Sequence, residues 1–91
     1  MPMIKPEEEI EFKFSEAVSN HKKGFYSVAA NLYLDILTIE PNHATSHGNL
    51  GVLFKQIGDI KSAQKHLSKA ISIDPKFIDA YFNLGIIEKE L

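Results

Sequence analysis

Hydrophobic residues recur along the chain every three or four positions, the spacing that places them on one face of an α-helix. The pattern is interrupted near Gly24 and Gly58 and again at Pro41 and Pro75. Glycine suits the left-handed residue that ends a helix, and proline cannot continue one. The interruptions predict helices over residues 7–22, 26–39, 44–57, 60–73 and 78–90. No segment alternates with the period of a β-strand over a useful length, so the expected fold class is all-α.

Charged residues near the predicted helix ends agree with these boundaries. Asp59 and Asp74 are placed to cap or to follow the end of a helix. Pro6 precedes three glutamates at 7–9. This order suits a first helical turn, because proline is tolerated there and the helix N-terminus favours negative charge.

The chain repeats itself with a period of about 34 residues, a length in the range of stacked repeat units. When positions 10–57 are compared with positions 44–91, nine of the 48 pairs are identical. They fall on turn, small and core positions, as expected for a structural repeat. One triplet, Asn49-Leu50-Gly51, returns as Asn83-Leu84-Gly85. Each period therefore corresponds to one pair of amphipathic helices.

Residues 44–77 resemble the tetratricopeptide repeat, whose pattern is W-x₂-L-G-x₂-Y, then A-x₃-F, then P. The matching residues are His47, Leu50, Gly51, Phe54, Ala63, Leu67, Ala70 and Pro75. The resemblance implies an α-solenoid of antiparallel helix pairs, about two and a half repeats long. Its expected parts are a lead-in at 1–9, repeats at 10–43 and 44–77, and the first helix of a third repeat at 78–91. We expect a single domain that is a fragment of a longer chain.

The first repeat departs from the family pattern. It carries Lys13, Glu16 and Asn20 where bulky apolar residues are usual. A first helix has no preceding repeat to pack against, so polar residues on its outer face are expected of an N-terminal cap. The chain also resembles, in order, the opening repeats of bacterial proteins that join tetratricopeptide repeats to a glycosyltransferase or sulfotransferase. The residues that carry this resemblance are Ala17, His21, Gly24, Ala29, Tyr33, Ile36, Leu37, Pro41, His43, Leu50 and Gly51. An arm of such an enzyme is therefore one alternative function.

The last predicted helix is apolar on more than one face. Its apolar residues are Ile78, Tyr81, Phe82, Leu84, Ile86 and Ile87. A helix of this kind normally has something packed on it. Either the protein continues past this helix or an oligomer covers its surface. For the second alternative, a self-assembling scaffold, the candidate self-association residues are Tyr81, Leu84 and Ile87.

Glycine inside a helix costs about 1 kcal/mol relative to alanine, so helical glycines need a compensating role. We expect Gly51 and Gly85 to lie where the paired helices of a repeat approach most closely. In the family, the position of Gly48 faces the concave groove, where it is expected to leave a shallow gap. A phosphate-binding loop is not expected, because no lysine-serine or lysine-threonine pair follows these glycines.

The resemblance also implies that the first helix of each repeat lines a concave surface. Carried over residue by residue, it gives as peptide-binding candidates Asn49, Asn83, Phe14, Val18, Val52, Lys55, Phe82 and Ile86. An asparagine amide can both donate to and accept from one peptide unit. Two of them one repeat apart are expected to hold an extended chain by its backbone, and similar asparagine ladders line the groove of O-linked N-acetylglucosamine transferases. The alternative for these asparagines is a generic groove or helix-packing role.

One subfamily of these repeats captures the C-terminal carboxylates of chaperones with positively charged groove residues. Here Asp79 and Asn83 stand where the third repeat would carry positive charge. Because Asp79 would repel a carboxylate, this activity is not expected.

Composition restricts the other possible partners. All ten basic residues are lysine, against twelve acidic residues, and the chain has no cysteine. Nucleic acid is not an expected partner without arginine, and disulfides and thiolate metal sites are excluded. No apolar stretch approaches the length that a membrane-spanning helix needs. We expect a soluble, cytoplasmic chain that does not enter a membrane.

Candidate chemistry in the sequence is sparse. His43 and His47 share a helix face at a spacing that suits metal ligands, but no third ligand is evident. Lysines at 61, 65 and 69 form a stripe that is either a solvated convex face or an acidic docking patch. No nucleophile, base and orienting group come together. We therefore predict a non-enzyme without metal or cofactor, whose partner is a protein or peptide.

Overall fold

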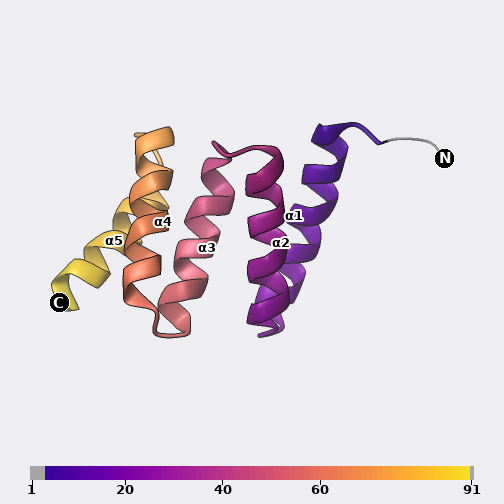
Figure 1. The fold of residues 1–91 in the computed structure, drawn as a ribbon. Coiled ribbons are helices and arrows are strands. Elements are labelled where there is room, and N and C mark those ends of the chain that lie inside the picture. The colour runs from indigo at the N-terminus through magenta and orange to yellow at the C-terminus, as the bar shows by residue number, and fades with distance from the viewer. Residues whose placement is uncertain (1–3, 91) are drawn as a thin grey trace. The chain divides into compact units, whose positions relative to one another are not determined.

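The computed structural model describes residues 4–90 (Figure 1). Its helices are α1 (Pro6–Lys22), α2 (Tyr26–Ile39), α3 (Ala44–Gln56), α4 (Ile60–Ile73) and α5 (Ile78–Glu90). Their bounds agree with the predicted ranges to within one residue, and residues 4–90 contain no strand. The all-α class is confirmed. The first turn of α1 lies within the predicted lead-in, while residues 1–3 of that lead-in and Leu91 lie outside the described residues.

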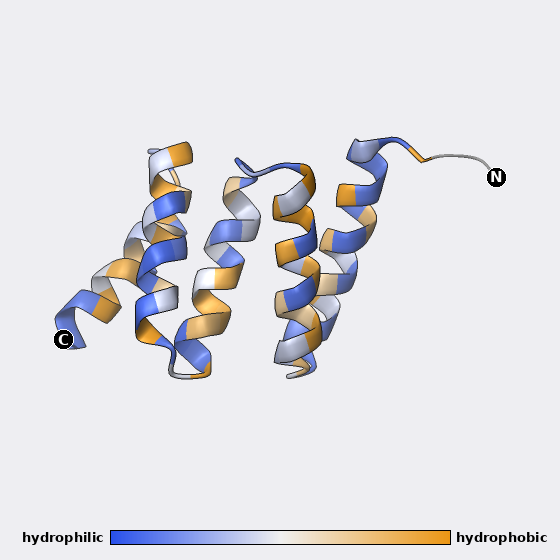
Figure 2. Cartoon of the chain, viewed as in Figure 1, coloured by the Kyte–Doolittle hydropathy of each residue, from blue (hydrophilic) through white to orange (hydrophobic). Residues whose placement is uncertain are grey.

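The chain divides into two compact units, Met1–Pro41 and Asn42–Leu91. In the first unit, α1 packs against α2. In the second, α4 packs against both α3 and α5, and α3 also contacts α5. Figure 2 shows hydrophobic and hydrophilic residues interleaved along the helices, as expected for helices that bury one face and expose the other.

Glycines in the left-handed conformation end the first helix of both pairs. Gly24 has φ of 83° and Gly58 has φ of 89°. After Gly24, the amide of Phe25 donates to the carbonyl of Asn20 at 2.9 Å; after Gly58, the equivalent bond is also 2.9 Å long. Both turns are Schellman motifs, in which glycine avoids the steric cost that a Cβ would bring at positive φ. The predicted turn role of both glycines is confirmed.

Side chains cap the helices of the second unit. Asp59 accepts a hydrogen bond from the backbone amide of Ser62 at 3.2 Å and so caps α4. Asp74 follows the end of the same helix, where its carboxylate accepts from the amide of Lys76 at 3.1 Å. Both aspartates act as predicted. His43 caps α3 through its Nδ1, which accepts from the amide of Ser46 at 3.2 Å. This cap was not expected, because histidine is not among the preferred N-cap residues.

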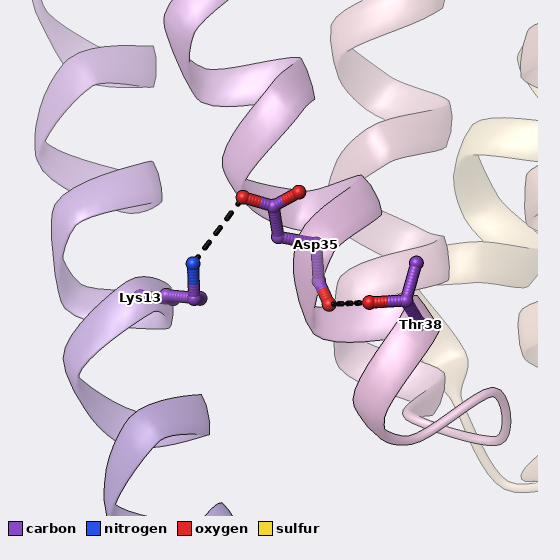
Figure 3. A network of polar contacts seen from close by, with 3 residues as sticks. All are labelled: Lys13, Asp35 and Thr38. Atoms are coloured by element: carbon purple, nitrogen blue, oxygen red, sulfur yellow. Dashed lines mark hydrogen bonds and ion pairs between the residues drawn. The ribbon is translucent and has the colours of Figure 1, made fainter.

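The first unit has a small core, and polar residues of α1 make contacts at its surface. Its buried hydrophobic residues are Ala17, Ala29, Tyr33 and Ile36. On α1, Lys13 reaches Asp35 of α2 with 3.2 Å between Nζ and Oδ2 (Figure 3). Glu16 is exposed, and Asn20 donates to the carbonyl of Glu16 at 2.8 Å. Two of the polar residues that replace the usual apolar ones, Lys13 and Asn20, therefore make polar contacts through their side chains.

The core of the second unit lies between α4 and its neighbours. One cluster of it comprises Ala63, Leu67, Ala70, Ala80 and Ile87, with Phe54, Ile60, Ile71, Phe77 and Leu84 packed against it, and Leu50 and Leu53 of α3 are buried as well. Gly51 is essential to the contact of α3 with α4, because a Cβ there would lie 2.6 Å from Cγ of Leu67 and 3.2 Å from its backbone nitrogen. The predicted packing role of Gly51 is confirmed.

The same role is not found at Gly85. A Cβ at this position would meet nothing within 4 Å among the described residues, and the glycine is exposed. The described residues include only the first helix of the third repeat, so the predicted close approach of paired helices at Gly85 stays a prediction.

Candidate binding pocket

The second unit contains a pocket between α3 and α5, with a volume of about 320 Å³. It is lined by Thr45, Gly48, Asn49, Val52, Leu67, Phe77, Asp79, Ala80 and Asn83. This volume lies at the lower end of the range of ligand-binding pockets. A pocket of this size is large enough for one or two amino-acid side chains. Apolar residues form part of its walls, and two amides, a hydroxyl and a carboxylate supply polar groups.

Asn49 and Asn83, the two predicted backbone-gripping asparagines, line this one pocket. They occupy equivalent positions of successive repeats, on α3 and α5, and both are half-buried. The amide nitrogen of Asn83 donates to the carbonyl of Asp79, one turn earlier, at 2.8 Å. This bond uses one N–H of the Asn83 amide and leaves its second N–H as a donor and its oxygen as an acceptor toward other groups.

Gly48 lies in the pocket wall, but its predicted role needs correction. The ring of Phe77 covers it, so that a Cβ on Gly48 would lie 2.9 Å from two carbons of that ring. Gly48 therefore leaves no gap, because Phe77 fills the space that a side chain would take. Sequence reasoning missed this partner because Phe77, the last residue of the second repeat, is not among the residues that match the family pattern.

Thr45 was not predicted to line the pocket, whereas the family resemblance placed Asp79 at a groove position. They are also one repeat apart, and each precedes one of the two asparagines by four positions. Residues four positions apart share a helix face. The positions of Asn49 and Asn83 in the sequence could therefore have predicted that Thr45 and Asp79 lie beside them. Both Thr45 and Asp79 are exposed.

The other predicted peptide-binding residues are distributed more widely. Val52 lines the pocket, whereas Lys55, Phe82 and Ile86 belong to the same unit but not to its lining. Phe14 and Val18 belong to the first unit and are half-buried there. The ring of Phe14 meets the ring of Tyr33 edge-on at 6.1 Å, within its own helix pair.

The predicted self-association residues differ in exposure. Ile87 is 1% exposed and belongs to the core of the second unit, so it cannot reach another copy. Leu84 packs against the same core, while Tyr81 is 50% exposed. The exposed apolar surface of α5 instead centres on Ile78 and Phe82, which are 77% and 67% exposed. Ile87 was wrongly assigned because helical periodicity does not show which side of a helix its neighbours cover.

The histidines make structural contacts within the second unit. Nδ1 of His47 lies 3.1 Å from Nδ1 of His66, which joins α3 to α4. Their rings are 26° from parallel with centroids 5.3 Å apart, and His66 also stacks on Phe54 with centroids at 5.5 Å. Burial is the largest influence on His66, and with the neighbouring charges of His47 and Lys65 it lowers the pKa of His66 to about 4.

Other predicted chemistry is not assembled in the described structure. Within residues 4–90, no group of three histidine, cysteine, aspartate or glutamate residues is placed to hold a metal. The lysines at 61, 65 and 69 are all exposed on α4. Among the described helices, none combines the length and apolarity needed to cross a membrane.

Comparison with known proteins gives matches to one family. Residues 53–90 match the family model described as TPR repeat. The O-mannosyl-transferase TMTC4 of Mus musculus is 35% identical over 51 residues, which are 56% of this chain and 7% of that protein. An N-terminal acetyltransferase A complex subunit-like protein of Schizosaccharomyces pombe is 31% identical over 88 residues, 97% of this chain and 13% of that protein. The chain thus spans a small part of either relative.

A solved structure has the same fold. A mutant O-GlcNAc transferase of Thermobaculum terrenum superposes with a TM-score of 0.88 over 94% of this chain and 16% of that one, at 22% sequence identity. At this level of sequence identity the likeness shows the fold alone, and it confirms the predicted α-solenoid class. The family match over residues 53–90, together with the internal sequence repeat and the glycine-ended helix pairs, identifies tetratricopeptide repeats in this chain.

Proposed function

We propose that the second unit binds an extended segment of a partner protein in the pocket between α3 and α5. The observation that carries this proposal is that Asn49 and Asn83 line the same pocket. Each amide can pair with one peptide unit of a bound chain whatever its sequence. Repeat proteins of this kind generally serve as interaction modules, and no catalytic step is assigned to this chain.

The energetics require more than the two asparagines. A net gain of about 1 kcal/mol per hydrogen bond leaves two amides far short of the roughly 8 kcal/mol of a micromolar complex. An aliphatic side chain that buries about 100 Å² of apolar surface adds about 2.5 kcal/mol. Val52 and Phe77 in the pocket wall are suited to receive such a side chain. Specific binding therefore needs both the backbone contacts and an apolar anchor.

The test is to select peptides against the chain from a random displayed library and to measure their affinity by fluorescence anisotropy. The double variant Asn49→Ala with Asn83→Ala should bind about 30-fold more weakly, since each amide contributes about 1 kcal/mol. Asn31→Ala is the control, because Asn31 is an exposed asparagine of α2. Unchanged affinity in a double variant that keeps its helical circular dichroism would refute the proposal.

A second candidate is that the chain is the repeat arm of a larger transferase. It is favoured by the names of the relatives, an O-mannosyl-transferase and an acetyltransferase complex subunit-like protein. In this case the pocket positions a protein substrate while catalysis belongs to a separate domain. Sequencing the transcript beyond codon 91 tests this idea. A glycosyltransferase or sulfotransferase domain would support it, and further repeats up to a stop codon would refute it.

A third candidate is self-association through α5, which is favoured by the exposure of Ile78 and Phe82. Large apolar side chains in contact with water favour association when a complementary surface is available. Because Ile87 is buried, the association surface assigned to α5 is Ile78, Tyr81 and Phe82.

A further inference from the structure

The polar side of the pocket is rich in hydrogen-bond acceptors. Asp79 and Asn83 lie one helical turn apart on α5, and both line the pocket. The amide nitrogen of Asn83 donates one N–H to the carbonyl of Asp79 at 2.8 Å, so its oxygen stays available as an acceptor and its second N–H as a donor. A carboxylate accepts only, so these two neighbours together offer acceptors to whatever enters the pocket.

The carboxylate of Asp79 also carries the charge of the pocket. Among the described residues that line the pocket, Asp79 is the charged one. No described lysine forms an ion pair with Asp79. The positive end of the α5 dipole is partial and falls off within one turn, whereas Asp79 is exposed and carries a full charge.

We propose that the pocket selects a partner segment in which an aliphatic side chain is followed by a basic one, lysine or arginine. This inference rests on the proposed function and specifies its ligand. The aliphatic group contacts Val52 and Phe77, and the basic group donates to the carboxylate of Asp79 and the amide oxygen of Asn83. Charge complementarity commits the site to a cationic segment and disfavours an acidic one.

The experiment uses two acetylated and amidated peptides, Ser-Gly-Leu-Lys-Gly-Ser and its counterpart with glutamate in place of lysine. Each is titrated into the isotope-labelled chain, and affinities are taken from the amide chemical shifts of Asn49, Val52 and Asn83. We expect the lysine peptide to bind about fivefold more tightly at low salt, which corresponds to ~1 kcal/mol for a solvent-exposed ion pair. The difference should shrink in high salt.

Two variants separate selectivity from a merely structural role of Asp79 in the first turn of α5. Asp79→Asn should bring the two peptides to within about twofold of each other, because it removes the charge and keeps the shape. Glu88→Gln removes one exposed charge from the same helix outside the pocket lining and should leave the fivefold preference intact. If Asp79 serves only the helix end, Asp79→Asn lowers stability and leaves the preference unchanged, which would overturn the inference.

The remaining outcomes distinguish this inference from the proposed function. Equal affinities for the two peptides, with shifts at Asn49 and Asn83, would overturn the basic preference and leave backbone gripping in place. No shift with either peptide at millimolar concentration would also overturn it. The proposed function is then judged by the library-selected peptides alone, and it fails if those peptides do not need the two asparagines.

Discussion

Two glycines at the same repeat position have opposite surroundings. Gly51 faces Leu67, whose Cγ would lie 2.6 Å from an added Cβ, whereas Gly85 faces open space within the described structure. The sequence pattern treats the two as equivalent. Their energetic roles differ because a helix packs against Gly51 and no described helix packs against Gly85.

The substitutions Gly51→Ala and Gly85→Ala should therefore have opposite effects on stability. Gly51→Ala is expected to lower the free energy of unfolding by about 1–2 kcal/mol, because overpacking outweighs the gain in helix propensity. Gly85→Ala should raise it by about 0.5–1 kcal/mol, because alanine is the better helix former and meets no clash. Urea denaturation followed by circular dichroism measures both. Destabilisation by Gly85→Ala would contradict the open environment.

The pair His47 and His66 is expected to make the free energy of unfolding depend on pH. Across 3.1 Å, Nδ1 of one ring must donate a hydrogen bond to Nδ1 of the other. The donor ring can become charged without loss of this bond, but protonation of the accepting Nδ1 would break it. The pKa of His66 is about 4 in the folded chain, below its ordinary value of 6.5. Between these values the unfolded chain binds more protons than the folded chain, and stability falls as the pH falls.

We expect the free energy of unfolding to be independent of His66 above about pH 6.5 and to decline as the pH falls through the window down to about pH 4. Carboxylates also titrate at the acid end of this window, so the variant His66→Gln provides the baseline. Its stability should fall less steeply than that of the wild type over the same range. Parallel pH profiles of the two proteins would show that the pair has no such role.

At the scale of the element, hydrogen bonds at the start of α4 are expected to stabilise the second unit. Asp59 satisfies the amide of Ser62, and its second oxygen accepts from the hydroxyl of Ser62 at 2.8 Å. Both bonds hold the first turn of α4, the helix on which α3 and α5 pack. The N-terminus of this helix has no acidic residue in its first turn, so the cap supplies the local negative charge.

Replacement of Asp59 should loosen this turn. Asp59→Ala is expected to cost about 1 kcal/mol of stability, whereas Asp59→Asn should cost only a few tenths, since asparagine also caps helices. Amide hydrogen exchange at Ser62 and Ala63 is the direct measurement, and it should be faster in the alanine variant. Equal exchange in all three proteins would mean that packing alone holds the start of α4.

At the scale of the whole molecule, the exposed residues of α5 decide whether the chain associates. Ile78 and Phe82 are exposed and Tyr81 is half exposed, while Ile87 on the same helix is buried. Substitutions at the two kinds of position therefore separate loss of association from loss of folding.

The variant Ile78→Lys with Phe82→Lys should remain folded and monomeric when the wild type associates, because it charges the exposed surface and leaves the core intact. Ile87→Glu should instead unfold the second unit at a cost above about 3 kcal/mol, because it buries an unpaired charge. Sedimentation velocity over a range of concentrations gives the masses, and circular dichroism the folding. A wild type that is monomeric at high concentration would refute self-association.

The sequence by itself determined the helices, their order and their repeat. Gly24, Gly58, Pro41 and Pro75 mark breaks at a fixed period, and such local signals act through backbone geometry that needs no tertiary contact. The repeat period also gives Asn49 and Asn83 the same register, and both line the pocket between α3 and α5.

Only the tertiary structure decided which faces are covered. It put Phe77 over Gly48, buried Ile87, left Gly85 open and joined His47 to His66 across two helices. A hydrophobic period shows that a helix has an apolar face, but the partner on that face comes from elsewhere in the chain. Such pairings depend on side-chain volume and helix placement, which only the packed structure specifies.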